Sequence, residues 1–297
     1  MQRPKIICVV GATSTGKSDL AVRIAKKYNG EVISADSRQV YKGLNLGTGK
    51  VTKKEMAGIP HHLLNVAAPK TTYTAANYEK DATEALQRIL NKSRIPIICG
   101  GTGLYIDALL GKLTLPEVPP NKKLRASLSK LPAEKLFKKL QKLDPRRAKE
   151  IDQYNPVRLI RAIEIATSLG SVPKLNKYKP RYETLTIGLT LPKEELQKRI
   201  HTRLLARMKQ GMLREARGLH AKGLSWKRME ELGLEYRYMA KHLQGKISKQ
   251  EMVERLEKEI VQYARRQVTW FKRDRQIHWL SPTEGEKVLS LVTNFLK

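Results

Sequence analysis

The chain has 297 residues, of which 58 are Lys or Arg and 28 are Asp or Glu, so its formal net charge is +30. A hydrophobic content of 40% excludes a chain disordered by composition, and no apolar run reaches membrane-spanning length. Two cysteines exclude a disulfide framework and paired-cysteine zinc sites, so the reducing cytoplasm is the expected compartment. The charge favours a polyanionic partner such as nucleic acid, although well-solvated basic faces would explain it equally.

The first hundred residues alternate between strand-like and helical segments. Short β-branched runs predict buried strands, and apolar residues at helical spacing predict helices between them. The strands are expected at residues 5–10, 31–35 and 95–99, and the helices at 18–28 and 74–91. Cys8 and Cys99 lie in two of the strands and are expected to be buried, reduced thiols. This alternation predicts a parallel α/β sheet whose strand ends face one ligand crevice.

The character of the sequence changes near 116–120, where three prolines precede a stretch almost free of glycine. Helices are expected at 122–130, 133–143, 145–152 and 156–169, then a late strand at 185–191, then helices at 193–210, 212–222, 249–272 and 284–296. We therefore predict an α/β core begun by residues 1–118, an all-helical insertion at 119–184, and a mostly helical completion of the core by 185–297.

A phosphate-binding loop follows the first predicted strand. The pattern GxxxxGK[ST] is fitted by Gly11, Ala12, Thr13, Ser14, Thr15, Gly16, Lys17 and Ser18. Successive backbone N–H groups and the helix dipole would bind phosphate oxygens, with Lys17 as a further cation. The Ser18 hydroxyl would help to ligate Mg²⁺. A glycine-rich turn with a coincidental lysine is the weaker reading, so the core is expected to be a P-loop NTPase-like sheet.

The phosphate loop alone does not specify which reaction follows phosphate binding. The strand at 95–99 ends in Gly-Gly-Thr-Gly rather than in the aspartate of an ATPase, which favours a transferase with a phosphorylated donor. Asp36 stands at the end of the preceding strand and would face the same crevice. It could accept a proton from a nucleophile or hold a metal through water, but a turn or helix-cap role is equally open.

Eight ordered stretches carry a resemblance to one family. They are GATSTGKS at 11–18, DSRQVYKGLNLGTGK at 36–50, PHHL at 60–63, GGTGLY at 100–105, NPVRLIRAIE at 155–164, RIHTR at 199–203, GLEYRY at 233–238 and QYARRQVTWFKRD at 262–274. Together they resemble the bacterial tRNA dimethylallyltransferases, also called tRNA isopentenyltransferases. At Val51 and Asn65 the sequence departs from the Pro and Asp that are common in that family.

The resemblance implies an activity and roles for three residues. The family transfers a dimethylallyl group from dimethylallyl diphosphate to the exocyclic amine of the adenosine just 3′ of the tRNA anticodon, releasing pyrophosphate with the help of Mg²⁺. By motif position Asp36 would be the general base. Thr13 would lie near the bridging oxygen of the donor, and Arg203 would reach its diphosphate. From the sequence alone, Arg203 reads as a solvated helix charge.

The resemblance also implies contacts with tRNA, whose target base must be flipped out of the anticodon loop. Asp36 and its neighbours would read the base, and the insertion would grip the anticodon stem-loop. The expected contacts are Asp36, Ser37, Arg38, Gln39, Thr102, Arg125, Val157, Arg158, Leu159, Ile160, Arg161, Gln262, Arg265 and Arg266. The stretch 262–273 reads equally as an amphipathic helix with Tyr263, Trp270 and Phe271 partly in the core.

Three other functions remain open at this point. A transferase acting on free adenine nucleotides would need no basic insertion, and a small-metabolite kinase would need an arginine-rich lid over ATP. An RNA-binding protein without activity would leave the phosphate loop and Asp36 without a purpose. The adjacent His61 and His62 are expected to be structural rather than metal ligands. No exposed apolar heptad repeat is visible, so a monomer without membrane association is expected.

Overall fold

The computed structural model describes residues 3–174 and 180–297, which fall into two compact units. Unit 1 comprises Met1–Lys112 and Lys179–Lys297, and unit 2 comprises Leu113–Tyr178. Unit 2 therefore begins and ends six residues earlier than the insertion expected at 119–184. No helix in the described part of the chain is long and apolar enough to cross a membrane.

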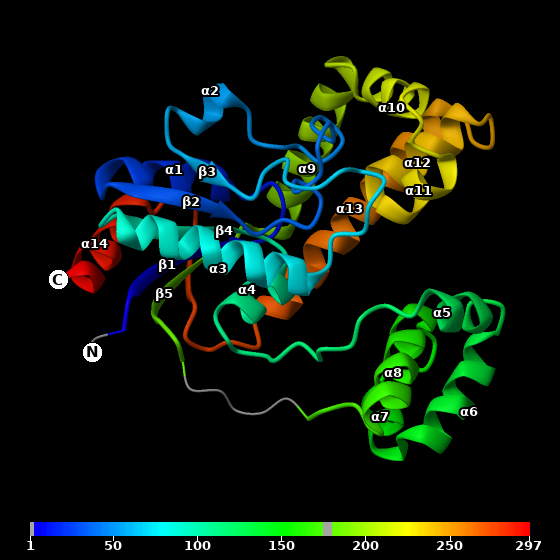
Figure 1. Cartoon of the computed structure of the whole chain (residues 1–297). Coiled ribbons are helices and arrows are strands. Elements are labelled where there is room, and N and C mark those ends of the chain that lie inside the picture. Colours follow the sequence, from blue (N-terminus) through cyan, green and yellow to red (C-terminus); the bar gives the residue numbers. More distant parts are fainter. Residues whose placement is uncertain (1–2, 175–179) are drawn as a thin grey trace. The chain divides into compact units, whose positions relative to one another are not determined.

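Unit 1 is built on a six-stranded sheet with the order β3-β2-β4-β1-β5-β6, in which every pair is parallel (Figure 1). The strands are β1 (Lys5–Gly11), β2 (Gly30–Ser34), β3 (His61–His62), β4 (Ile95–Gly100), β5 (Glu183–Leu189) and β6 (His278–Leu280). β1 lies in the middle because its apolar run is buried on both faces, as parallel strands require. The expected α/β class and the late strand that joins the sheet are confirmed.

Helices cover both faces of this sheet. Against one face pack α1 (Lys17–Lys27) and α14 (Gly285–Leu296), whose Ile24 and Val292 meet the odd-numbered side of β1. Against the other pack α3 (Ala75–Asn91) and α4 (Gly103–Leu109), where the rings of Tyr78 and Tyr105 stack with centroids 4.1 Å apart. α3 begins at a capping box in which the Thr74 side chain accepts from the backbone N–H of Asn77.

A bundle of helices forms the second core of unit 1. It contains α9 (Lys193–Lys209), α10 (Met212–Ala221), α11 (Trp226–Leu232), α12 (Leu234–Leu243) and the long α13 (Lys249–Phe271). Buried side chains recur along α13 at Met252, Leu256, Ile260 and Ala264, so this helix is amphipathic as its spacing predicts. The loop after β2 packs Val40, Tyr41 and Leu44 into the same core. That loop therefore joins the sheet to the bundle.

Unit 2 is all helical, as its sequence predicts. Its helices are α5 (Lys122–Leu128), α6 (Ala133–Leu143), α7 (Pro145–Glu150) and α8 (Pro156–Leu169). They enclose a small core in which Leu136, Leu140, Leu159 and Ile163 are fully buried. The buried Glu164 ties the start of α5 to α8, because its carboxylate accepts from the backbone N–H of Asn121 and from the side chain of Arg125.

Several short elements escape prediction from the sequence. They are α2 (Lys53–Met56), β3, α4, α11, α12 and β6. Gly100-Gly101-Thr102-Gly103 predicts a loop, but α4 already begins at Gly103 because Tyr105 and Ile106 pack beneath α3. β3 has two residues and pairs with β2 alone, so no periodicity of its own could reveal it.

Candidate active site

The main cavity of unit 1 has a volume of about 620 Å³ and opens at the carboxyl ends of the central strands. The phosphate loop follows β1, Asp36 follows β2, and Gly100 ends β4 with Gly101 directly after it. All three places contribute residues to the cavity wall. α9, α12 and α13 supply the remaining wall. The strand ends therefore do face one crevice, which confirms the expectation from the α/β alternation.

The phosphate loop forms part of the cavity wall. Thr13, Ser14, Gly16, Lys17 and Ser18 line the cavity, whereas Gly11, Ala12 and Thr15 are buried and shape the turn. Lys17 bonds back to the Ala12 carbonyl through Nζ. Burial, reinforced by the Arg203 cation, lowers the pKa of Lys17 to about 8 although Cys99 and Asp36 raise it. A bound anion would favour the charged form of this lysine and raise its pKa again.

Gln267 on α13 links the two glycine loops, a role that the sequence does not reveal. Its Oε1 accepts from the backbone N–H of Thr13 at 2.8 Å, and its Nε2 donates to the Gly101 carbonyl at 3.1 Å. The side chain is 5% exposed, so both bonds are shielded from water. Gln267 lies 254 residues from Thr13 along the chain. Gln267 thus fixes the entry of the phosphate loop against the loop after β4.

Asp36 is oriented by the backbone that follows it. Its Oδ1 accepts from the N–H groups of Arg38 at 2.8 Å and Gln39 at 3.2 Å. Among the residues that the structure describes, none donates to Oδ2, and Asp36 lines the cavity. The turn role that the sequence left open is therefore observed, and it leaves the second oxygen open for the catalytic role. One oxygen holds the turn, and the other is available to a ligand.

The groups around Asp36 present polar atoms to the same space. Ser37, Arg38 and Gln39 line the cavity, and the N–H of Ser37 donates to Thr102 Oγ1 at 3.1 Å. Tyr263 on α13 also lines the cavity, and burial followed by the charge of Asp36 raises the pKa of its phenol. The hydroxyl of Tyr263 therefore stays protonated at neutral pH, and the side chain adds an aromatic group to the cavity that holds Asp36.

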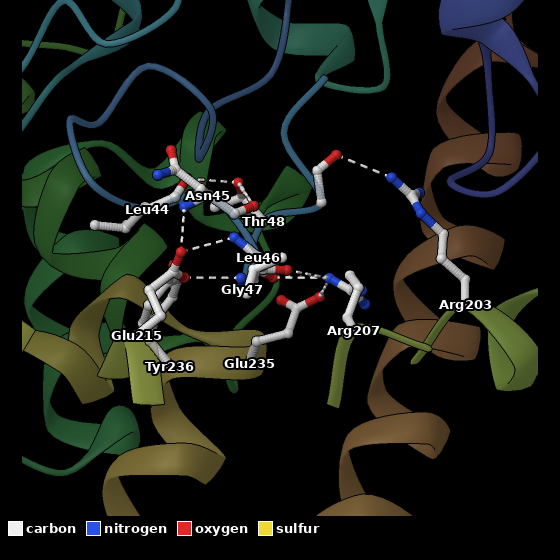
Figure 2. A network of polar contacts seen from close by, with 11 residues as sticks. Leu44, Asn45, Leu46, Gly47, Thr48, Arg203, Arg207, Glu215, Glu235 and Tyr236 are labelled. Carbon is white, nitrogen blue, oxygen red and sulfur yellow. Dashed lines mark hydrogen bonds and ion pairs between the residues drawn. The ribbon is translucent and has the colours of Figure 1, made fainter. Parts of the chain in front are cut away.

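Arg203 lies on α9 in the wall of the cavity, where its side chain is exposed but has a backbone partner. Its Nη2 donates to the Gly49 carbonyl at 2.9 Å (Figure 2). Partial removal from water, and then the Arg207 cation, lower its pKa. Lys17 and Arg203 are thus two cations whose charged forms are both disfavoured by their surroundings. An anion placed in the cavity would relieve both.

The residues expected to contact tRNA have different environments. On α13, Gln262, Arg265 and Arg266 are exposed while Phe271 is buried, so the stretch is both an amphipathic helix and a basic surface. In unit 2, Val157 is 77% exposed and Arg158 is exposed.

Four other residues of unit 2 have structural partners. The side chain of Leu159 is fully buried in the helical core, so the expectation that this side chain contacts tRNA is wrong. Ile160 packs partly against the same core. Arg125 and Arg161 both pair with the buried Glu164, and each keeps about a third of its side chain or more exposed.

The two adjacent histidines have structural partners. His62 Nε2 lies 2.6 Å from Oε2 of the buried Glu31, which also pairs with Lys92 and Arg94. His61 Nδ1 donates to the Ile59 carbonyl at 2.9 Å. The contact of His62 with Glu31 fastens β3 to β2, and the His61 bond holds the chain just before β3, so both histidines have the structural role expected for them.

The cavity brings together a phosphate loop, several arginines and a carboxylate with one unbonded oxygen. This arrangement suits a transferase with a phosphorylated donor. The IPP transferase family model matches residues 39–274, and the chain belongs to that family. It is 46% identical over 272 residues to tRNA dimethylallyltransferase 2 of Treponema denticola, covering 90% of this chain and 91% of the relative.

Solved structures give the same result for the fold. The full-length tRNA isopentenylpyrophosphate transferase from Bacillus halodurans superposes with a TM-score of 0.75 at 31% identity, covering 99% of this chain and 97% of that one. A eukaryotic dimethylallyltransferase acting on tRNA superposes with a TM-score of 0.82 at 25% identity, covering 99% and 79%. The family resemblance of the eight motifs is thereby confirmed.

Proposed function

We propose that the protein transfers a dimethylallyl group from dimethylallyl diphosphate to the exocyclic amine of the adenosine 3′ of the tRNA anticodon. The observation that carries this proposal is the Asp36 carboxylate, whose free oxygen opens into the cavity of the phosphate loop. A phosphoryl transferase would use the loop to activate phosphorus. Here the loop holds a leaving group instead, and the carboxylate serves the nucleophile.

The reaction balances with groups already present in the cavity. The amine nitrogen forms a bond to the allylic carbon, while the carbon–oxygen bond breaks and its electrons pass to the departing diphosphate. The proton of the amine goes to Asp36 Oδ2. Negative charge grows on the diphosphate, where Lys17, Arg203 and the N–H groups of the phosphate loop stabilise it. Thr13 lies at the start of that loop, beside the bridging oxygen in this proposal.

Magnesium fits the donor set as a partner of the diphosphate. Ser18 is the second residue of α1 and lines the cavity, and its hydroxyl is a suitable ligand. The described residues contain no cluster of three or more His, Cys, Asp or Glu that could hold a metal ion. Mg²⁺ commonly takes phosphate oxygens and waters with one or two protein ligands. When bound, the ion neutralises charge on the leaving group.

The tRNA-binding surfaces follow from exposed basic and apolar groups in both units. Arg38, Gln39, Thr102 and Tyr263 surround the flipped adenine, where hydrogen bonds and an aromatic face recognise an unstacked base. Exposed Gln262, Arg265 and Arg266 on α13, and Val157, Arg158, Arg125 and Arg161 in unit 2, contact the RNA. In this proposal the protein works as a monomer in the cytoplasm.

The test is incubation of the purified protein with Mg²⁺, dimethylallyl diphosphate and unmodified tRNA, followed by nucleoside mass spectrometry. A dimethylallyl mass gain on the adenosine next to the anticodon is the expected result. Product on AMP or ADP but not on tRNA would overturn the tRNA substrate. Consumption of ATP with no prenylated product would overturn the reaction itself.

A further inference from the structure

The loop that joins β2 to α2 is held by charged side chains from the helical bundle. Glu215 on α10 accepts three consecutive backbone N–H groups, from Asn45 at 3.0 Å, Leu46 at 2.8 Å and Gly47 at 2.9 Å (Figure 2). A fourth donor is the hydroxyl of Tyr236, 2.7 Å from Oε1. Both carboxylate oxygens are therefore engaged, each by two donors.

The opposite side of the same loop faces a cation. Arg207 on α9 donates from Nη1 to the carbonyls of Leu46 at 3.1 Å and Gly47 at 2.9 Å. The same nitrogen lies 3.1 Å from Oε1 of Glu235, which holds the guanidinium in place. Arg207 is 9% exposed, so these bonds form away from water, where charged hydrogen bonds are strong. The carboxylate takes the N–H groups and the guanidinium takes the carbonyls.

Two glycines of this loop, Gly47 and Gly49, leave little room for another arrangement. A Cβ on Gly47 would lie 2.5 Å from the ring of Tyr236. Gly49 has φ +58, and a Cβ there would lie 2.5 Å from Nη2 of Arg203. The loop therefore approaches the bundle as closely as backbone can, and Thr48 Oγ1 closes it by donating to the Leu44 carbonyl at 2.8 Å.

The held loop ends at the donor site. Thr48 and Gly49 line the main cavity, and the Gly49 carbonyl is the acceptor for Arg203 Nη2 at 2.9 Å. Glu215 does not line that cavity. Any effect of Glu215 on donor binding must therefore pass through groups that do line the cavity, and the loop offers a route through Gly49 to Arg203.

We propose that Glu215 and Arg207 are positioning residues, which fix loop 44–49 so that the Gly49 carbonyl orients Arg203 toward the diphosphate of the donor. This inference rests on the proposed function for the identity of the diphosphate. It assigns no proton transfer or bond-making to either residue. It adds a second set of residues on which the charge stabilisation of the leaving group depends.

Glu215→Gln is the direct perturbation. The amide matches the carboxylate in shape but replaces one accepting oxygen by an NH₂ donor, which then opposes two of the four donors. We expect the affinity for inorganic diphosphate with Mg²⁺, measured by calorimetry, to fall on the order of tenfold. The kcat/KM for dimethylallyl diphosphate should fall on the order of 10- to 100-fold, because small misplacements of a catalytic group carry such costs.

A double-mutant cycle separates positioning from general damage. In an Arg203→Ala background, Glu215→Gln should change diphosphate affinity by less than about twofold, because the group through which it acts is gone. Additive losses in the cycle would overturn the proposal, as would wild-type diphosphate affinity in Glu215→Gln. Tyr236→Phe removes one of the four donors and should give a smaller loss with the same non-additivity. This milder variant keeps the proposal testable if Glu215→Gln fails to fold.

The control variant is Glu284→Gln. Glu284 also accepts a backbone N–H, from Ser281 at 2.7 Å, but it lies at the start of α14 and does not line the cavity. The diphosphate affinity of Glu284→Gln should equal that of the wild type.

The proposed function and the positioning role can fail separately. If the cycle is non-additive for diphosphate binding but the wild type prenylates no tRNA, the proposed function fails and the positioning role stands. If the wild type prenylates tRNA but the cycle is additive, the proposed function stands and the positioning role fails.

Discussion

Replacing Asp36 by Asn tests the roles of the two carboxylate oxygens separately. The amide oxygen can still accept from the N–H groups of Arg38 and Gln39, so the turn after β2 is preserved. The free position, Oδ2, becomes an NH₂ group that cannot accept the proton of the adenine amine. Asp36→Ala, in contrast, removes the base and both bonds that hold the turn.

The expected magnitude follows from these two roles. Loss of a positioned general base lowers a rate on the order of 10²- to 10⁴-fold, or about 3–5 kcal/mol of barrier. Asp36→Asn should lose that rate while keeping its melting temperature. Asp36→Ala should lose as much rate and also about 1–3 kcal/mol of stability, from two unpaired backbone N–H groups. Affinity for tRNA should stay within a few-fold in both variants, since one carboxylate adds little to a cationic surface.

The assay is single-turnover transfer with tRNA bound in advance and product measured by nucleoside mass spectrometry. Filter binding gives the tRNA affinity, and thermal unfolding gives the stability of each variant. A rate for Asp36→Asn above about a tenth of wild type would refute the role of Oδ2 as the base. Collapse of tRNA binding in both variants would show that Asp36 is structural, and the assignment of the site would be wrong.

Three further predictions test other parts of the molecule. Burial alone would raise the pKa of the Glu164 carboxyl, but hydrogen bonds from Arg125 and Arg161 hold that pKa at about 2. The ionised carboxylate therefore contributes about 3 kcal/mol to the free energy of unfolding above pH 4.5, and this contribution is lost as the pH falls toward 2. Amide exchange of α5 and α8 in the full chain should accelerate over that range, and Glu164→Gln should remove the pH dependence. Affinity for tRNA should fall steeply with salt as phosphate contacts release counterions, and a flat dependence would contradict RNA binding through the basic surfaces. Burial raises the pKa of Cys8 to about 12 and of Cys99 to about 11, so neither thiol should react with alkylating reagents in the folded protein at pH 7, and rapid labelling would show that one is accessible.

Local sequence patterns predicted the parts of the site that are built locally. The phosphate loop needs a strand, a fixed glycine pattern and a helix start, all within Lys5–Lys27. Asp36 was found for the same reason, since it follows a strand in a parallel sheet. The charge on α9 gave no such signal. Only the family resemblance singled out Arg203, which the structure places in the cavity wall.

The remaining site residues depend on contacts between distant parts of the chain. Gln267 bonds to Thr13 across 254 positions, and Glu215 bonds to Gly47 across 168. Such pairs leave no periodicity, because each residue alone reads as an ordinary polar position on a helix. Gly47 and Gly49 were visible in a matching motif, but only the ring of Tyr236 and the guanidinium of Arg203 explain why a side chain cannot stand there.

Most of the excess positive charge lies outside the main cavity. Among the described residues that line the main cavity, seven are Lys or Arg and five are Asp or Glu, so the donor site carries only a small part of the +30. Its affinity for diphosphate must therefore come from the direction of a few groups, above all Lys17, Arg203 and the loop N–H groups. The rest of the surplus lies on other surfaces, where it attracts a polyanion over a range that salt shortens. Salt should consequently raise the KM for tRNA much more than the KM for the donor. Equal sensitivity of the two constants would show that the surplus acts on the cavity as a whole, and that the fixed geometry around Arg203 matters less than its charge.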